Sequence, residues 1–249
     1  MLDDVSFDVR AGEVLALAGG NGAGKSVLIK CLSGLHQPDS GRIIWQGKEV
    51  HLRTPSDASA LGIATVYQDL AMCDNLDVVQ NMFLGRERRH RWTVDDEKME
   101  LAARATLRDL GVTSLRSVGQ KVAALSGGQR QSVAIAKAVL WHSELVIMDE
   151  PTAALGVVQT EVVLQLIRTL ADKGLAVIVI SHNMIVISHN MNDVFRVVDR
   201  IAVLYLGRLA GVRSVSELSR MAVIDLMATG RSDRLGSGGQ VAAELSGGS

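Results

Sequence analysis

The chain has 249 residues, of which 47% are hydrophobic and 21% charged, and this composition excludes a mainly disordered protein. Its 26 Lys and Arg residues nearly balance 27 Asp and Glu residues, so a net charge of −1 gives no general attraction to nucleic acid or membranes. The two cysteines, Cys31 and Cys73, lie in unrelated contexts, which argues against a disulfide framework or a zinc site. No signal peptide opens the chain and no apolar run reaches the ~18 residues of a membrane span, so we expect a cytosolic protein that can still dock on a membrane protein.

Apolar runs in the first part of the chain predict a strand, a glycine-rich loop and a helix in direct succession. Further on, the periodicity becomes helical and indicates a separate helical lobe. The basic run at residues 86–91 is most simply a solvated loop. In chain order, the predicted elements are a strand at Val14–Ala18, a helix at Lys25–Leu32, two short strands within 42–50, a strand at Ile63–Tyr67, and helices between about Asn75 and Val139, clearest at Lys98–Leu110.

Apolar strands that alternate with helices return in the second half of the chain. Continuous apolar strands of this kind indicate a parallel sheet covered on both faces, so the fold class is α/β. The predicted elements are strands at Leu145–Met148, Ala176–Ile180 and Ile201–Leu204, helices at about Val157–Asp172 and Ser214–Thr229, and a Gly/Ser-rich flexible tail at 236–249.

A heptapeptide repeat interrupts this pattern, because Ile178–Met184 is followed at once by the identical Ile185–Met191. Seven extra residues would reverse the faces of a strand but add about two turns to a helix. We therefore expect the first copy to finish the strand and the second to be absorbed downstream.

The segment Gly19–Ser26 has the pattern G-x-x-x-x-G-K-S between a predicted strand and a predicted helix. Glycines let several backbone N–H groups converge on phosphate oxygens, and the helix start adds positive potential. Lys25 would reach the β- and γ-phosphates and Ser26 would ligate Mg²⁺. The alternative is a glycine turn with an accidental Lys-Ser, which the surrounding strand and helix disfavour.

Asp149 and Glu150 follow the apolar strand at 145–148, at the edge where a parallel sheet binds ligands. Asp149 would support the Mg²⁺ shell, and Glu150 would act as the general base that polarises water toward the γ-phosphate. Taken alone, such a pair more often caps a helix, but the phosphate loop upstream favours the functional interpretation.

A second anion-binding helix start is predicted where Leu125-Ser-Gly-Gly-Gln129 opens a helical run. With this motif the sequence resembles the ATP-binding-cassette (ABC) ATPase family, whose Leu-Ser-Gly-Gly-Gln signature completes the nucleotide site of the opposite subunit. The resemblance covers nearly the whole chain with the motifs in order. It implies a P-loop NTPase fold of ABC type, with a mainly parallel core, a small antiparallel β part and an inserted helical subdomain.

The resemblance also implies roles for individual residues. Gln68 would contact the metal and the attacking water and signal to a permease, although a glutamine alone would be read as solvated. Ser126 and Gly128 would touch the γ-phosphate in trans. The implied catalytic residues are Glu150, His182, Gln68 and Lys25; the implied metal ligands are Ser26, Gln68 and Asp149; and the implied ATP-binding residues are Gly19, Gly20, Asn21, Gly22, Ala23, Gly24, Lys25, Ser26, Val27, Ser126, Gly127, Gly128 and Gln129.

The repeat provides two candidates for the histidine that, in the family, holds the γ-phosphate. His182 has the correct spacing from the upstream helix and strand, whereas His189 has the family-like continuation Asn-Met-Asn-Asp-Val-Phe195. We favour His182 because the strand end fixes the position of an active-site residue, and either histidine could instead cap a helix or lie on the surface.

Two further departures from the family pattern bear on activity. Gly156 stands where family members have an Asp that crosses the dimer interface. The chain also begins after the strand and adenine-stacking aromatic residue of the family, so we expect either weaker adenine binding or a truncated start. Leu245-Ser-Gly-Gly-Ser249 imitates the signature, but no helix follows it and we assign it to the tail.

The predicted organisation is a single ABC ATPase domain at 1–235, with a core at about 1–72 and 140–212, a helical subdomain at about 73–139 and a C-terminal helix at about 214–229. Several motifs look like those of ATPase subunits of bacterial simple-sugar importers. The resemblance therefore implies ATP and Mg²⁺ as cofactors, a homodimer or paired cassette, a permease docked at about Cys73–Arg91, an indirect periplasmic sugar-binding protein, no nucleic acid, and a peripheral location on the cytoplasmic face of the membrane. The alternatives are a non-transport ABC ATPase and a degenerate, non-catalytic cassette.

Overall fold

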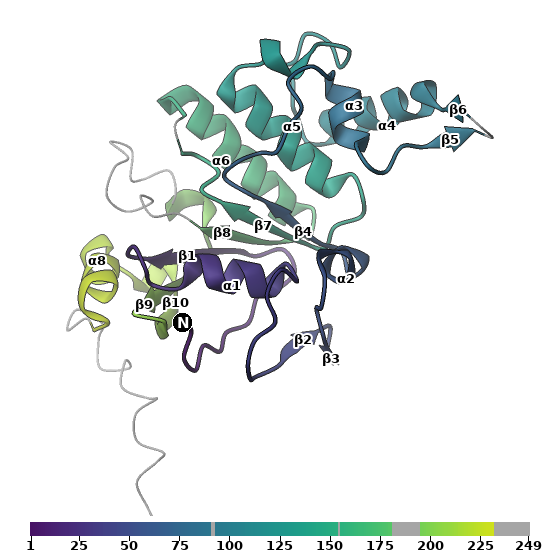
Figure 1. Ribbon diagram of the computed structural model, residues 1–249. Helices are drawn as coiled ribbons and strands as arrows, with labels where there is room; N and C mark the ends of the chain where they lie inside the picture. The colour runs from purple at the N-terminus through teal and green to yellow at the C-terminus, as the bar shows by residue number, and fades with distance from the viewer. Residues whose placement is uncertain (91–92, 154, 181–194, 232–249) are drawn as a thin grey trace, which may run out of the picture.

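A six-stranded sheet in the order β10-β9-β1-β8-β7-β4 forms the centre of the protein (Figure 1). The structure is a computed structural model, and it describes residues 1–90, 93–153, 155–180 and 195–231. Neighbouring strands pair in parallel except β9 and β10, which are antiparallel. The strands are β1 (Val14–Gly19), β4 (Ile63–Val66), β7 (Leu145–Asp149), β8 (Ala176–Ile180), β9 (Arg200–Tyr205) and β10 (Arg208–Ser214). The mainly parallel sheet that the sequence predicted is confirmed.

Two hydrophobic cores cover the two faces of this sheet. Successive side chains of β1 alternate between them: Ala16 packs with α5 and α6, whereas Leu15 and Leu17 pack with α1. Figure 1 shows α1 on the opposite side of the sheet from α5 and α6. Burial on both faces explains why the strands read as continuous apolar runs.

Most helices lie close to the positions that the sequence predicted, but the helix at Pro55–Ala60 was not predicted and the last helix begins later than expected. They are α1 (Lys25–Leu32), α2 (Pro55–Ala60), α3 (Val78–Phe83), α4 (Asp96–Asp109), α5 (Gly127–Val139), α6 (Val157–Asp172) and α8 (Arg220–Thr229), with 3-10 turns at Val122–Ala124 and Val215–Glu217. The last helix was predicted to begin at Ser214, which is wrong. Ser214 ends β10, and Ser219 caps α8 by accepting a hydrogen bond from the backbone N–H of Ala222 (3.1 Å).

Two small antiparallel hairpins accompany the main sheet. The pair β2 (Ile43–Trp45) and β3 (Lys48–Val50) forms the two short strands expected around Gly47. The pair β5 (Arg89–His90) and β6 (Thr93–Val94) was not predicted and lies between α3 and α4, where the basic run was read as a solvated loop. The solvated-loop prediction is confirmed for residues 86–88, which are exposed and outside helices and strands, and it is wrong for the strand at Arg89–His90. Arg89 pairs in the hairpin, and Arg86 stacks on Trp141 with its Cζ atom 5.3 Å from the ring centroid.

In the described parts of the chain, no helix combines the length and apolar character needed to cross a membrane.

A buried asparagine on α3 holds the start of the helical region together. Asn81 is 0% exposed, and its side-chain oxygen accepts a hydrogen bond from the backbone N–H of Cys73 (2.8 Å). Its amide nitrogen donates to the carbonyl oxygens of Cys73 and Asp77, both at 2.9 Å. One side chain therefore ties α3 to the segment that precedes it.

We predict that Asn81→Ala lowers the free energy of unfolding by about 2–3 kcal/mol, because it removes the acceptor of the part-buried Cys73 N–H and leaves a cavity at a fully buried position. Chemical denaturation measures this change. The matched control is Asn75→Ala at an exposed position, for which we expect a change within about 0.5 kcal/mol. Equal unfolding midpoints for the two variants would contradict the prediction.

Candidate nucleotide-binding site

The loop between β1 and α1 has the geometry of a phosphate-binding loop. Gly24 is the N-cap of α1 with φ 101°, a left-handed conformation that favours glycine, and no side chain caps the helix there. By contrast, Thr54, Asp77 and Ser126 cap α2, α3 and α5 with their side chains. The start of α1 thus presents backbone N–H groups and the positive end of the helix dipole without a competing side-chain acceptor.

Lys25 lies at the centre of this loop and is only 3% exposed. Its Nζ donates hydrogen bonds to the carbonyl oxygens of Gly19 (2.6 Å) and Gly20 (2.8 Å). Burial lowers the pKa of Lys25, while the negative charges of Glu150 and Asp149 act in the opposite direction. The predicted base and metal ligand therefore lie within electrostatic reach of the phosphate-loop lysine.

Asp149 and Glu150 occupy the end of β7, as predicted. Asp149 is the last residue of the strand, and Glu150 follows in a left-handed conformation with φ 53° that non-glycine residues rarely adopt. The backbone N–H of Glu150 donates to the carbonyl oxygen of Ile180 at the end of β8 (2.9 Å). Glu150 is 9% exposed, so its carboxylate is held in a restricted environment beside the sheet edge.

Gln68 lies at the same edge, one strand further along. Val66 at the end of β4 is in register with Met148 of β7, so Gln68 and Glu150 each follow the paired position by two residues. Gln68 is exposed. The parallel register thus brings the predicted lysine, the carboxylates and the glutamine to one edge of one sheet.

The signature residues form a well-capped helix start. Ser126 caps α5 by accepting a hydrogen bond from the backbone N–H of Gln129 (3.4 Å), and Gln129 Oε1 accepts one from the backbone N–H of Ser126 (2.9 Å). Gln129 also donates to the carbonyl oxygen of Ser114 (2.6 Å). A Cβ atom placed on Gly128 would have atoms of Gln159, on α6, as its nearest neighbours. The signature is therefore fixed next to the start of α6.

Three contacts of the site were not anticipated from sequence. A Cβ on Gly19 would lie 2.6 Å from the carbonyl oxygen of Leu204, so β9 supports the phosphate loop from a distant part of the chain. Leu155 and Gln159 surround the signature glycines. Gly156 is the N-cap of α6, and its N–H donates to Gln159 Oε1 (2.7 Å). The three-residue spacing of this last pair is a helix-capping signal that the sequence already contains.

His182, His189 and most of the heptapeptide repeat lie outside the described residues, as does the tail from residue 232. The described part of the first copy, Ile178–Ile180, does complete β8, as expected. The choice between the two histidines stays a prediction.

The residues present fit a magnesium nucleotide better than a metal held by protein alone. Among residues 1–90, 93–153, 155–180 and 195–231, no group of three or more His, Cys, Asp and Glu side chains could hold an ion. Mg²⁺ is commonly bound through one or two carboxylates together with substrate phosphates, which matches a single Asp149 beside a phosphate loop. The hydroxyl of Ser26, exposed at the start of α1, supplies a further oxygen of the required kind.

Comparison with known proteins places these motifs in a family. The ABC transporter family model matches residues 2–153. A fructose import ATP-binding protein of Rhizobium meliloti is 47% identical over 214 residues, covering 83% of this chain and 80% of the relative. A xylose/arabinose import ATP-binding protein of Sulfolobus acidocaldarius is 42% identical over 226 residues, covering 91% and 87%. Ribose import proteins, such as that of Chromobacterium violaceum (39% identical), are longer, and the chain covers 44% of that relative.

Solved structures agree with this assignment. A nucleotide-free ATP-binding cassette from an ABC transporter superposes with a TM-score of 0.74 at 25% identity, covering 86% of this chain and 85% of the other. A dimeric cassette in a post-hydrolysis state with bound ADP and Pi superposes with a TM-score of 0.66 at 25% identity, covering 86% and 90%. Because the family model spans more than half of the chain and relatives above 40% identity cover most of it, this protein belongs to the ABC transporter family as one of its ATP-binding cassettes.

Proposed function

We propose that this chain is the ATP-hydrolysing subunit of an importer for a simple sugar and works with a membrane permease. The observation that carries the proposal is that Lys25, after β1, lies at the same edge of the parallel sheet as Asp149 and Glu150 at the end of β7. A cation that binds phosphate and a carboxylate that can polarise water are the two groups that hydrolysis of a terminal phosphate requires. The fructose, xylose/arabinose and ribose import names of the relatives support the sugar.

In this proposal, each residue acts on the phosphates that the loop would hold. Backbone N–H groups of residues 19–27 cradle the phosphates, and Lys25 exchanges its present carbonyl partners for phosphate oxygens. Glu150, whose backbone is anchored to β8, takes a proton from the attacking water. Bound Mg²⁺, held by Ser26, Gln68 and Asp149, would neutralise charge that develops on the phosphates.

The signature of one chain acts, in this proposal, on the nucleotide of a second copy. Ser126, Gly127, Gly128 and Gln129 start a capped helix whose positive end suits an anion. The solved dimeric cassette with ADP and Pi supports a paired arrangement of this kind. We therefore propose a homodimer, or a pairing with a related cassette, with two ATP molecules at the interface.

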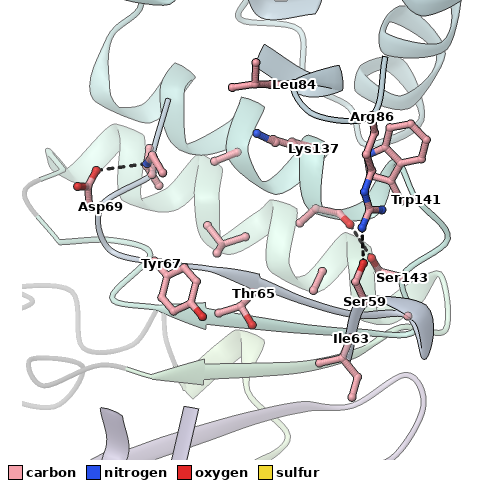
Figure 2. A pocket seen from close by; sticks show the side chains of 17 residues that line it. Ser59, Ile63, Thr65, Tyr67, Asp69, Leu84, Arg86, Lys137, Trp141 and Ser143 are labelled. Atoms are coloured by element: carbon pink, nitrogen blue, oxygen red, sulfur yellow. Dashed lines mark hydrogen bonds between the residues drawn. The ribbon is translucent and has the colours of Figure 1, made fainter. Parts of the chain in front are cut away.

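A pocket beside Gln68 supports docking of a permease. The pocket has a volume of about 310 Å³ and lies between β4, α5 and the segment that follows α3 (Figure 2). Tyr67 and Asp69, on either side of Gln68, line one wall, and Lys137 of α5 lines another. A partner seated here would contact both the Gln68 segment and the helix that begins with the signature. This pocket includes part of the segment 73–91 that was predicted to meet the permease.

The pocket wall is both apolar and cationic. Phe83 and Trp141 pack edge to face with ring centroids 5.4 Å apart, and Arg86 lies over Trp141 and donates a hydrogen bond to Ser59. Burial lowers the pKa of Lys137. Leu84, 41% exposed, adds an apolar edge to the pocket (Figure 2).

With a permease as partner, we place the protein peripherally on the cytoplasmic face of the membrane, where it would act indirectly with a periplasmic sugar-binding protein. No role for nucleic acid is proposed.

We predict that Lys25→Ala lowers ATP hydrolysis by at least about 100-fold, because it removes the positive charge of the lysine that would stabilise the phosphates. Glu150→Gln should retain ATP binding, lose hydrolysis to a similar degree, and accumulate as an ATP-bound dimer. Phosphate release and size-exclusion chromatography with ATP measure the two effects. Hydrolysis by the unaltered chain no faster than by Lys25→Ala would instead favour a non-catalytic cassette.

We predict that His182→Ala, and not His189→Ala, abolishes hydrolysis, because His182 follows the last residue of β8 by two positions in the sequence and His189 by nine. Each variant serves as the control for the other in the same phosphate-release assay. Loss of turnover in His189→Ala alone would move the role to the second copy of the repeat.

We predict that Leu84→Asp leaves basal hydrolysis within about two-fold and removes most of the stimulation by a permease, because it puts a charge on the apolar edge of the pocket. The assay compares the chain alone with membranes in which the chain is co-expressed with a sugar-importer permease. Leu101→Asp on α4, at a residue 61% exposed, is the matched control. Equal stimulation of the two variants would place docking elsewhere.

A further inference from the structure

The side chain of Gln159 fills the space between the first turns of α5 and α6. A Cβ atom placed on Gly128 would lie 2.9 Å from both the Cβ and the Cγ atoms of Gln159, closer than real Cβ contacts allow. Gly128 is buried, so the absence of a side chain there is what admits the two carbons of Gln159. The glycine therefore serves packing within the chain as well as any approach to a phosphate.

The other end of the Gln159 side chain fixes the loop before α6. Its Oε1 accepts a hydrogen bond from the backbone N–H of Gly156 (2.7 Å). A Cβ on Gly156 would lie 2.7 Å from that same oxygen, so a side chain at position 156 would displace the carboxamide. Leu155, in the same loop, reaches within 3.2 Å of a Cβ placed on Gly127. Leu155 and Gln159 thus pack against Gly127 and Gly128, the two glycines of the signature.

The loop that Gln159 holds begins at Glu150. The N–H of Glu150 donates to the carbonyl of Ile180 (2.9 Å), and the N–H of Ala153 donates to the carbonyl of Glu150 (3.0 Å). The N–H of Leu155 donates to the carbonyl of Thr152 (3.4 Å), so hydrogen bonds between described residues link Glu150 to the residue before Gly156. A shift of Gln159 would be transmitted along this link, because a tight turn has little freedom to absorb a displacement.

We propose that Gln159 is a positioning residue that couples the start of α5 to the loop carrying Glu150. The inference rests on the proposed function, in which Glu150 acts on the nucleotide of its own chain and the signature contacts that of the second copy. The methylene groups of Gln159 hold the signature, and its carboxamide holds the Glu150 loop. One side chain thereby links the two nucleotide sites of the dimer.

Three substitutions separate the two contacts. Gln159→Ala loses both, Gln159→Met keeps the carbons against Gly128 but cannot accept the hydrogen bond, and Gln159→Glu keeps both. Hydrolysis by the purified full chain is measured against ATP concentration, which yields kcat, KM and the Hill coefficient. We expect Gln159→Ala to lower kcat about ten-fold and to bring the Hill coefficient toward one. Gln159→Met should be intermediate, and Gln159→Glu should stay within about two-fold of the unaltered chain.

Two features keep the result interpretable. Gln165→Ala, also exposed on α6, removes only a contact with Glu161 (3.0 Å) and should leave all three parameters unchanged. Thermal unfolding shows whether each variant is folded. If Gln159→Ala is unfolded, the Hill coefficients of Gln159→Met and Gln159→Glu are compared instead, because these two variants differ in the hydrogen bond to Gly156. A role in packing alone would lower the melting temperature but leave the Hill coefficient of the folded protein unchanged, and that result overturns the proposal.

Failure of this inference can be told apart from failure of the proposed function. If the unaltered chain hydrolyses ATP no faster than Lys25→Ala, the proposed function fails and the coupling falls with it. If the unaltered chain is active and cooperative, and the Met and Ala variants at position 159 match it, only the coupling is overturned.

Discussion

Parallel pairing of β1, β8, β7 and β4 is the constraint on which the rest of this structure depends. Parallel strands bring their carboxyl ends to one edge, so the phosphate loop after β1 and the carboxylates after β7 meet there, although more than 120 residues separate them. Two hydrophobic cores, one on each face, hold the strands in register. The placement of Lys25 at the same sheet edge as Asp149 and Glu150 follows from that register.

The same edge concentrates polar groups that would be costly in a core. Lys25 is buried at the base of its loop, where it donates to two carbonyl oxygens instead of to water. Glu150 adopts a rare backbone conformation, and such strain persists where surrounding hydrogen bonds over-determine it, as the contact with Ile180 does here. The site is thus preorganised by the sheet rather than by its loops alone.

Glycine has distinct physical roles at different positions of the site. Gly24 supplies a left-handed turn at the start of α1, and Gly19 admits the carbonyl of Leu204. Gly128 admits Gln159, and Gly156 leaves room for the carboxamide of that same residue. The glycine excess of the composition therefore reflects close approach within the chain as well as approach to a nucleotide.

The sequence by itself determined most strands, most helices and the motifs at 19–26, 125–129 and 149–150, because these depend on local periodicity and spacing. It did not show the helix α2, the two-residue strands of the β5–β6 hairpin, or β10, a seven-residue strand at the edge of the sheet whose sequence contains two arginines and a glycine and forms no apolar run. Only the tertiary structure placed Gln159 against Gly128, Leu204 against Gly19, and a pocket beside Gln68. These contacts join residues far apart in the chain, and packing rather than local pattern decides them.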